Sequence, residues 1–193
     1  MRRIQLGDVF YTKVPRGYKL YQYAYKPSKY GTYIRVFPGL YDTIPENIAE
    51  IVKAPHSYIS YFVISRAYRI GLAVYLGNYP VPEEYPLPNY EICFQVNNHT
   101  KKVDAINVMK SSNAAPDCER FDQTFYVERF DQLPKAYQTT LLNGGSNPCV
   151  LMHMFNVDFD LEHPEREYID TNRKEMLLQY LAEVNQLLEK ARY

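Results

Sequence analysis

The carboxylates that precede His163 are the side chains of this chain best suited, by type and spacing, to do chemistry. They lie in the segment DFDLEHPEREYID at 158–170, and oxygen-rich clusters of this kind can bind hard cations. Apolar residues alternate with the first three carboxylates, however, and this two-residue period is typical of the solvated face of a strand. We therefore expect an acidic surface and predict no metal and no cofactor, with a cation site at His163 left open as the alternative. The three carboxylates are those of Asp158, Asp160 and Glu162.

Motifs for nucleophilic catalysis are absent from the sequence. There is no GxSxG motif and no glycine-rich phosphate loop, and none of the three cysteines, Cys93, Cys118 and Cys149, lies in a recognisable nucleophile motif. We predict that the chain is not an enzyme. The alternative is a hydrolase whose pocket would bring His163 or His153 together with Cys149 or a carboxylate.

Tyrosines and basic residues are interleaved throughout residues 11–35. Proteins bind single-stranded nucleic acids by combining stacking aromatic rings with cations that follow the backbone. The sequence pI near 6.9 lacks the strongly basic balance usual for such domains, so nucleic-acid binding is kept as an alternative to an ordinary sheet with a lysine-rich solvent face. Tyr21, Tyr23 and Tyr25 share one face of a predicted strand, where they could form a contact surface for a partner.

The formal net charge of zero hides an asymmetry along the chain. Residues 1–40 carry eight Lys and Arg against a single Asp, whereas residues 111–170 carry four Lys and Arg against eleven Asp and Glu. Each segment could steer an oppositely charged partner. The simpler expectation is that the two segments lie beside each other and neutralise.

The length and composition favour one domain that spans residues 1–193, because a chain of this size with 46% hydrophobic residues can bury a core of its own. The amino terminus MRRIQLGDVFYTK has no apolar run, so we expect no secretory signal, and no stretch approaches ~18 consecutive apolar residues, so we expect no membrane-spanning helix. The three cysteines are an odd number without a CxxC pair, which indicates free thiols in a reducing compartment. We expect a cytoplasmic protein with no membrane partner.

The periodicity of apolar residues predicts an α+β domain with a mostly antiparallel, twisted sheet and a C-terminal amphipathic helix packed on it. A polar turn should join YEICFQV to VDAINVM as a hairpin. Other strands are expected in the first 40 residues and at 57–77, 123–130 and 149–162, and helices at 43–54, 133–145 and 172–191.

The segment LGNYPVPEEYPLPNY at 76–90 holds four prolines, yet no two of them are three residues apart, so the PxxP signature of SH3 ligands is absent. Flexible linkers are polar, whereas this segment contains Tyr79, Tyr85 and Leu87. We predict an ordered, extended crossing within one domain, anchored by these side chains.

Two stretches of the chain share a recognisable order of strands and glycine steps. In LGDVFYTKVPRGYKLYQYAY (6–25), Gly-Asp-Val-Phe opens a first strand and an aromatic second strand follows a glycine turn. In IGLAVYLGNYPVPEEYPLPNY (70–90), a strand ends in an aliphatic-glycine step before a proline-bearing stretch. Together they resemble the twenty-sixth immunity-protein family of bacterial polymorphic toxin systems, over about residues 5–95. The tryptophan expected shortly before the aliphatic-glycine step is absent, and Ala73 or a neighbour stands there.

This resemblance implies a non-enzymatic antidote that binds a cognate protein toxin and occludes its active site or substrate groove. If the toxin were a nuclease, an acidic face could compete with nucleic acid. The residues expected to form that face are Asp158, Asp160 and Glu162, with the acidic residues of 117–122. The tyrosine-rich strand with Tyr21, Tyr23 and Tyr25 is the alternative contact surface.

Overall fold

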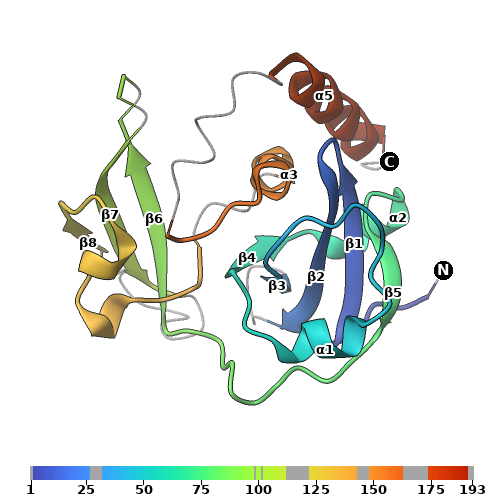
Figure 1. Cartoon of the computed structure of the whole chain (residues 1–193), viewed down its shortest axis with the longest axis horizontal. Helices are drawn as coiled ribbons and strands as arrows, with labels where there is room; N and C mark the ends of the chain where they lie inside the picture. Colours follow the sequence, from blue (N-terminus) through green and yellow to red (C-terminus); the bar gives the residue numbers. More distant parts are fainter. Residues whose placement is uncertain are drawn as a thin grey trace.

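The computed structural model describes residues 2–26, 32–97, 99–100, 102–111, 122–142, 148–162 and 174–190. In this part of the chain, the strands form two antiparallel sheets that lie side by side (Figure 1). The first sheet has the strand order β4-β3-β2-β1-β5, and the second has the order β6-β7-β8. The strands of the first sheet are β1 (Asp8–Val14), β2 (Gly17–Tyr25), β3 (Thr32–Val36), β4 (Tyr58–Phe62) and β5 (Val74–Asn78).

The central strand of the first sheet, β2, is buried on both faces. Tyr21 and Tyr23 belong to the largest buried apolar cluster, and Leu20 belongs to a second cluster on the opposite face. Aromatic and aliphatic residues therefore alternate without a solvated side, as expected for a strand covered on both faces. The two-residue alternation predicted for this strand is correct, but the side chains on both of its faces are buried.

The second sheet contains the predicted hairpin. It consists of β6 (Tyr90–Val96), β7 (Val103–Lys110) and β8 (Asp122–Phe125). β6 and β7 pair antiparallel, with Ile92 opposite Val108. Ile92 and Val108 also belong to the largest buried cluster, which contains residues of the first sheet as well. Apolar packing thus continues from one sheet to the other, while the assignment of 1–193 to one domain stays a prediction.

The two sheets are joined through residues 139–142, which we call the inter-sheet segment. On one side of this segment, the Ile59 N–H of β4 donates to the Thr140 carbonyl at 2.8 Å, and the Leu142 N–H donates to the Ile59 carbonyl at 2.9 Å. On the other side, the Ile92 N–H of β6 donates to the Leu141 carbonyl at 2.8 Å. The segment runs parallel to both strands, so it connects the two sheets edge to edge.

A second connection is the strap, residues 79–89, which leads from β5 to β6 along the lower side of the molecule in Figure 1. Its first residue bonds to the first sheet, because the Tyr79 N–H donates to the Gly7 carbonyl at 3.0 Å. Its last residue bonds to the second sheet, where the Ser111 N–H donates to the Asn89 carbonyl at 2.8 Å. Between these ends, Leu87 packs against a buried cluster of the first sheet. The prediction of an ordered, anchored crossing is confirmed for these residues.

Helices cover both faces of the first sheet. The short helix α1 (Ile48–Lys53) was predicted, and it buries Ile48 and Val52 against Leu20 and its neighbours. On the other face lie α2 (Ile64–Arg69) and α3 (Pro148–Val157), and α5 (Lys174–Lys190) packs on α3. The predicted apolar face of the last helix is confirmed at Val184 and Leu188, which are buried, whereas Leu187 of the same predicted face is 42% exposed. The predicted α+β class is confirmed.

Two predicted elements are wrong in type, and a third is correct only in part. The expected strand at 149–162 is the helix α3 followed by an irregular segment. The expected strands at 57–77 are present as β4 and β5, but α2 lies between them. Where the expected helix at 133–145 is described, at residues 133–142, it contains only the 3₁₀ turn η2 (Lys135–Tyr137), preceded by the 3₁₀ turn η1 (Phe130–Gln132). A short apolar run has no period that separates a buried helix from a buried strand, so packing against the sheet decided these cases.

None of the helices in the described residues combines the length and apolar character needed to cross a bilayer.

We predict that the approach of the strap to β1 makes Gly7 irreplaceable. Gly7 has φ +91°, and a Cβ atom there would lie 2.4 Å from the Tyr79 carbonyl oxygen. Gly39 has a similar φ of +81°, with open space around its missing Cβ, and it is the matched control. Ala at Gly39 should cost ~1 kcal/mol from the left-handed backbone alone, and Gly7→Ala should cost roughly 2 kcal/mol more. Equal midpoints of urea unfolding for the two variants would contradict this.

Candidate functional site

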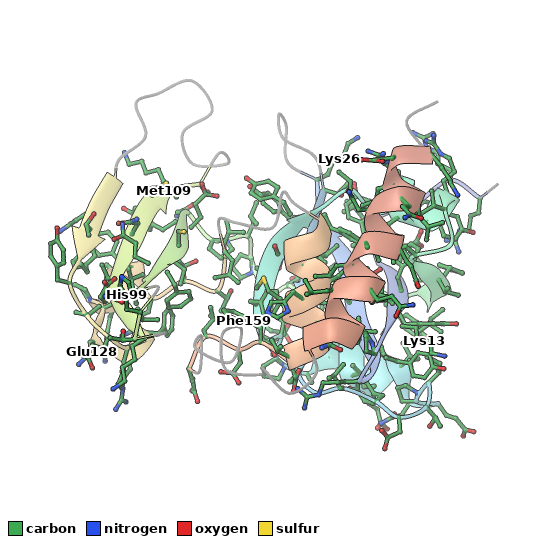
Figure 2. All side chains as sticks on the ribbon, turned by 90° about the horizontal axis from the view of Figure 1, so that it is seen from above. Lys13, Lys26, His99, Met109, Glu128 and Phe159 are labelled. Carbon is green, nitrogen blue, oxygen red and sulfur yellow. The ribbon has the colours of Figure 1, made fainter. Side chains whose placement is uncertain are left out.

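A groove lies where the end of the β1–β2 hairpin, the α2–β5 connection and helix α5 meet. Its volume is about 300 Å³, and we call it the α5 groove. Figure 2 shows Lys13, which lines it, beside α5. Three segments that are distant in sequence therefore supply its walls. Six of its lining residues are Tyr11, Tyr18, Leu72, Val74, Tyr180 and Leu187.

Aromatic and aliphatic side chains dominate the α5 groove. The rings of Tyr11 and Tyr18 meet edge to face with 5.5 Å between their centroids. The Tyr180 hydroxyl donates to the Lys13 carbonyl at 3.0 Å, which ties α5 to the hairpin. Val74 and Leu187 are 38% and 42% exposed, so a partner could reach apolar surface there. Tyrosine is enriched in the centres of protein interfaces, because its ring buries a large area while its hydroxyl stays hydrated.

The rim of the α5 groove carries both signs of charge. Lys13 and Glu183 line it, and both side chains are exposed. The Lys13 ammonium lies 6.0 Å from the centroid of the Tyr18 ring. An apolar floor with charged rim residues is the usual composition of a protein-binding surface.

The predicted acidic residues follow the end of α3 rather than a strand. Their apolar neighbours are buried as the alternation predicted. Phe159, labelled between the two sheets in Figure 2, packs edge to face on Tyr58 of β4 at 5.4 Å and on Phe94 of β6 at 6.2 Å. The alternation in burial predicted from the sequence is therefore present here without a strand.

Asp158 has a structural role that Asp160 and Glu162 do not share. It terminates α3 with a left-handed φ of 52°, and the Phe159 N–H donates to the Met154 carbonyl at 3.0 Å, as in a Schellman cap. Its carboxylate forms an ion pair with Lys19 of β2, whose side chain is fully buried. Burial lowers the pKa of Lys19, and the Asp158 carboxylate opposes that effect.

Asp160 and Glu162 remain at or near the surface. Glu162 is exposed, and its N–H donates to an Asp160 carboxylate oxygen at 3.0 Å. The three carboxylates thus do not act as one set. Asp158 links α3 to the first sheet, and the other two are accessible to a partner.

The tyrosine surface predicted on β2 is wrong for two of its three residues. Tyr21 is fully buried, with its hydroxyl 2.8 Å from the Thr12 hydroxyl and its ring stacked on Phe155 at 5.3 Å between centroids. Burial raises the pKa of Tyr21 far above its ordinary range. Tyr23 is also buried, because β2 is the central strand. Tyr25 is half-buried, and its hydroxyl donates to the Tyr85 carbonyl of the strap.

The interleaved tyrosines and cations of residues 11–35 are divided between core and surface. Tyr33, Lys19 and Arg35 are fully buried, in addition to Tyr21 and Tyr23. These residues cannot stack on bases or contact a phosphate backbone without unfolding. Part of the pattern that suggested single-strand binding is therefore the packing of a two-sided sheet.

Arg35 of β3 is a fully buried cation whose hydrogen-bond acceptors among the described residues are all neutral. Its guanidinium donates to the Gln22 side-chain oxygen at 3.1 Å, to the Ala54 carbonyl at 3.1 Å and to Nδ1 of His56 at 3.2 Å. The Tyr85 ring of the strap lies over it, 4.6 Å from the ring centroid. Burial lowers the pKa of Arg35 without depriving it of charge, because an arginine titrates far above neutral pH.

His56 connects this buried cation to the inter-sheet segment. Its Nε2 atom lies 3.0 Å from the Thr140 hydroxyl, and its ring meets the Tyr85 ring edge to face at 5.3 Å. Burial, and next the Arg35 charge, lower the pKa of His56 to about 4. The ring is thus neutral at pH 7 and acts as an acceptor for Arg35.

The predicted hydrolase residues are described only in part. His163 and Cys118 lie outside the described residues, and the structure places Cys149 in α3. His153 also lies in α3, four residues after Cys149, so these two predicted partners are on one helix. Among the described residues, no three His, Cys, Asp or Glu side chains gather in a way that could hold a metal ion. The cation site considered at His163 is therefore not addressed by the described residues.

Two features of the molecule were missed by reasoning from the sequence. Tyr11, Lys13 and Tyr18 lie on the face of the hairpin opposite to Tyr21, and the two-residue period would have pointed to them had that face been considered. Arg35 stands alone between Ile34 and Val36, and a single charge within an apolar strand is a signal of a buried polar network. Its partner His56 carries no such signal, because their contact is long-range.

Comparisons of the chain with protein-family models, with curated proteins and with solved structures find no match.

We predict that removing the charge of Asp158 destabilises the fold. Asp158→Asn keeps a residue that tolerates the left-handed conformation, so the variant isolates the loss of the ion pair to Lys19. Breaking a buried pair costs ~3 kcal/mol, and the 31% exposure of the Asp158 side chain places the expected loss toward 2 kcal/mol. The control is Glu162→Gln, on an exposed side chain, which should change the free energy of unfolding by less than about 0.5 kcal/mol. Urea unfolding measures both, and equal effects would refute the structural role.

We also predict that His56 makes the fold less stable in acid. Its pKa is about 4 in the folded protein and ~6.5 unfolded, so the unfolded chain binds the proton first as the pH falls. The contribution of His56 to stability is complete above pH ~6.5 and is lost on the way to pH ~4, a change of roughly 3 kcal/mol. His56→Gln should remove this part of the pH dependence. An NMR titration of the His56 ring with a midpoint near 6.5 would show that the prediction is wrong.

Proposed function

We propose that this chain is a non-enzymatic immunity protein of the cytoplasm, which binds a cognate toxin domain and blocks it by covering its working surface. The observation that supports this most is spatial. The two stretches that carry the family resemblance, 6–25 and 70–90, form one structural unit, in which β1 pairs with both β2 and β5. The strap then returns to this unit through Tyr79, whose carbonyl accepts a bond from Gln22 at 2.8 Å.

The contact surface we propose is the α5 groove, at one end of that unit. An apolar or aromatic side chain of the toxin would occupy the groove, because the floor is apolar and interfaces draw most of their affinity from such central anchors. Lys13 and Glu183 at the rim would pair with charges of the toxin and thereby favour the cognate partner over others.

A second surface is relevant if the toxin is a nuclease. The exposed carboxylate of Glu162 and the half-buried one of Asp160 could then take the place of nucleic-acid phosphates. Asp158 is left out of this acidic surface, since its carboxylate is bonded to Lys19. The acidic residues of 117–121 lie outside the described residues.

The proposal predicts that the toxin encoded beside this gene is neutralised through the α5 groove. Leu187→Asp places a charge on a side chain that lines the groove and is 42% exposed, so the fold should tolerate it. We expect the affinity for the toxin to fall at least ~10-fold, or roughly 1.4 kcal/mol. The matched control is Leu178→Asp, on the same helix at 54% exposure but outside the groove, which should bind as the unmodified protein does. Calorimetry and survival on co-expression provide the measurements.

Two other results would distinguish an error in the proposed contact surface from an error in the proposed function. If Leu187→Asp binds normally while Asp160→Lys with Glu162→Lys loses binding, the acidic surface is the contact and the groove is not. If the unmodified protein neither binds nor protects against the neighbouring toxin, the immunity function itself is wrong.

A further inference from the structure

A chain of hydrogen bonds runs from the core of the first sheet to the inter-sheet segment, and His56 stands in its middle. Nδ1 of His56 faces the Arg35 Nε–H at 3.2 Å, and Nε2 faces the Thr140 hydroxyl at 3.0 Å. Arginine always carries its protons, so Nδ1 must be the acceptor, and the single proton of the neutral ring is on Nε2. This tautomer donates to Thr140 and accepts from Arg35 at the same time.

A second proton on the His56 ring is incompatible with these hydrogen bonds. It would bind to Nδ1, where the Arg35 Nε–H already points, so two donors and two cations would face each other at 3.2 Å. The other acceptors of Arg35, which include the Gln22 side chain and the Ala54 carbonyl, are neutral and cannot offset the added charge. Arg35 is fixed in the core, whereas His56 is half-buried, so the imidazolium is the group that would move toward water.

Both connections between the sheets meet His56. Thr140 belongs to the inter-sheet segment, and the Tyr85 ring of the strap contacts both His56 and Arg35. The inter-sheet segment is also held to the second sheet, because the Thr139 hydroxyl donates to the Tyr90 carbonyl at 2.8 Å. If His56 leaves, the segment loses a partner only on the side of the first sheet.

We propose that His56 is an acid-sensitive latch between the two sheets. Protonation of Nδ1 releases Thr140 and Tyr85, and the inter-sheet segment then separates from β4 while it stays bonded to β6. Both sheets keep their own pairing. This inference concerns how the fold responds to acid, and it holds whether or not the protein binds a toxin.

The charged and titratable groups around His56 come from three elements. Arg35 lies on β3, Tyr85 on the strap, and Tyr25 on β2 bonds to the Tyr85 carbonyl. Tyrosines do not ionise in acid. Glu84 of the strap acts on Arg35 through space, so Glu84→Gln is the control that removes this charge at every pH.

The test is amide hydrogen exchange by NMR between pH 7 and pH 4.5, corrected for the intrinsic exchange rate. The Ile59 and Leu142 amides bond across the contact that opens, whereas the Ile92 amide bonds on the side that stays closed. For the unmodified protein, we expect the open fraction seen at Ile59 and Leu142 to rise on the order of 50-fold and to stay well above the open fraction seen at Ile92 at each pH. His56→Gln, whose amide can still accept and donate, should remove the rise, and Glu84→Gln should keep it.

Three results would overturn the proposal. One is an equal rise in His56→Gln and in the unmodified protein, which would assign the opening to other groups. Another is an open fraction at Ile92 and at the β2 amides that equals the one at Ile59 and Leu142 at every pH, which would mean that the fold opens as one unit. The last is constant protection at Ile59 and Leu142 in the unmodified protein. Circular dichroism of His56→Gln at pH 7 establishes that the variant is folded before the comparison is made.

Discussion

The arrangement of the molecule depends on the hydrogen bonds that residues 139–142 make to two sheet edges at once. β4 and β6 are the outermost strands on the facing sides of their sheets, and a strand edge without partners leaves backbone donors and acceptors unsatisfied. The inter-sheet segment bonds to Ile59 on one side and to Ile92 on the other. Phe159 fills the space nearby by contacting an aromatic ring of each sheet, so backbone pairing and apolar packing act at the same place.

Two fully buried cations hold helices and strands of the first sheet in place, each in a different way. Lys19 is paired with a carboxylate that arrives from the end of α3, and this contact ties a late helix to an early strand. Arg35 has only neutral acceptors and aromatic rings around it, so its position depends on a complete set of neighbours. A network of this kind specifies one arrangement strongly and tolerates added charge poorly. These two residues also remove part of the positive charge of the amino-terminal segment from the surface.

The side chains available to a partner are those that the core does not bury. The tyrosines on one face of the β1–β2 hairpin are buried in the core. Those on the other face line the α5 groove, because the hairpin extends beyond the sheet toward α5. The groove combines a stretch that carries the family resemblance with the C-terminal helix. If the proposed function holds, residues outside that resemblance would therefore contribute to recognition, which would let related folds bind different toxins.

The sequence alone determined the class of fold, the hairpin of the second sheet, the first and last helices and the ordered character of the proline-bearing strap, since each depends on local periodicity or turn residues. It also predicted that the basic and acidic segments lie together, which the pair of Lys19 and Asp158 bears out at one point. Only the tertiary structure decided that 148–157 is a helix, that 139–142 is an extended connection and that Tyr21 and Arg35 are interior. Burial is set by what packs on a residue from elsewhere in the chain, and no local pattern contains that information.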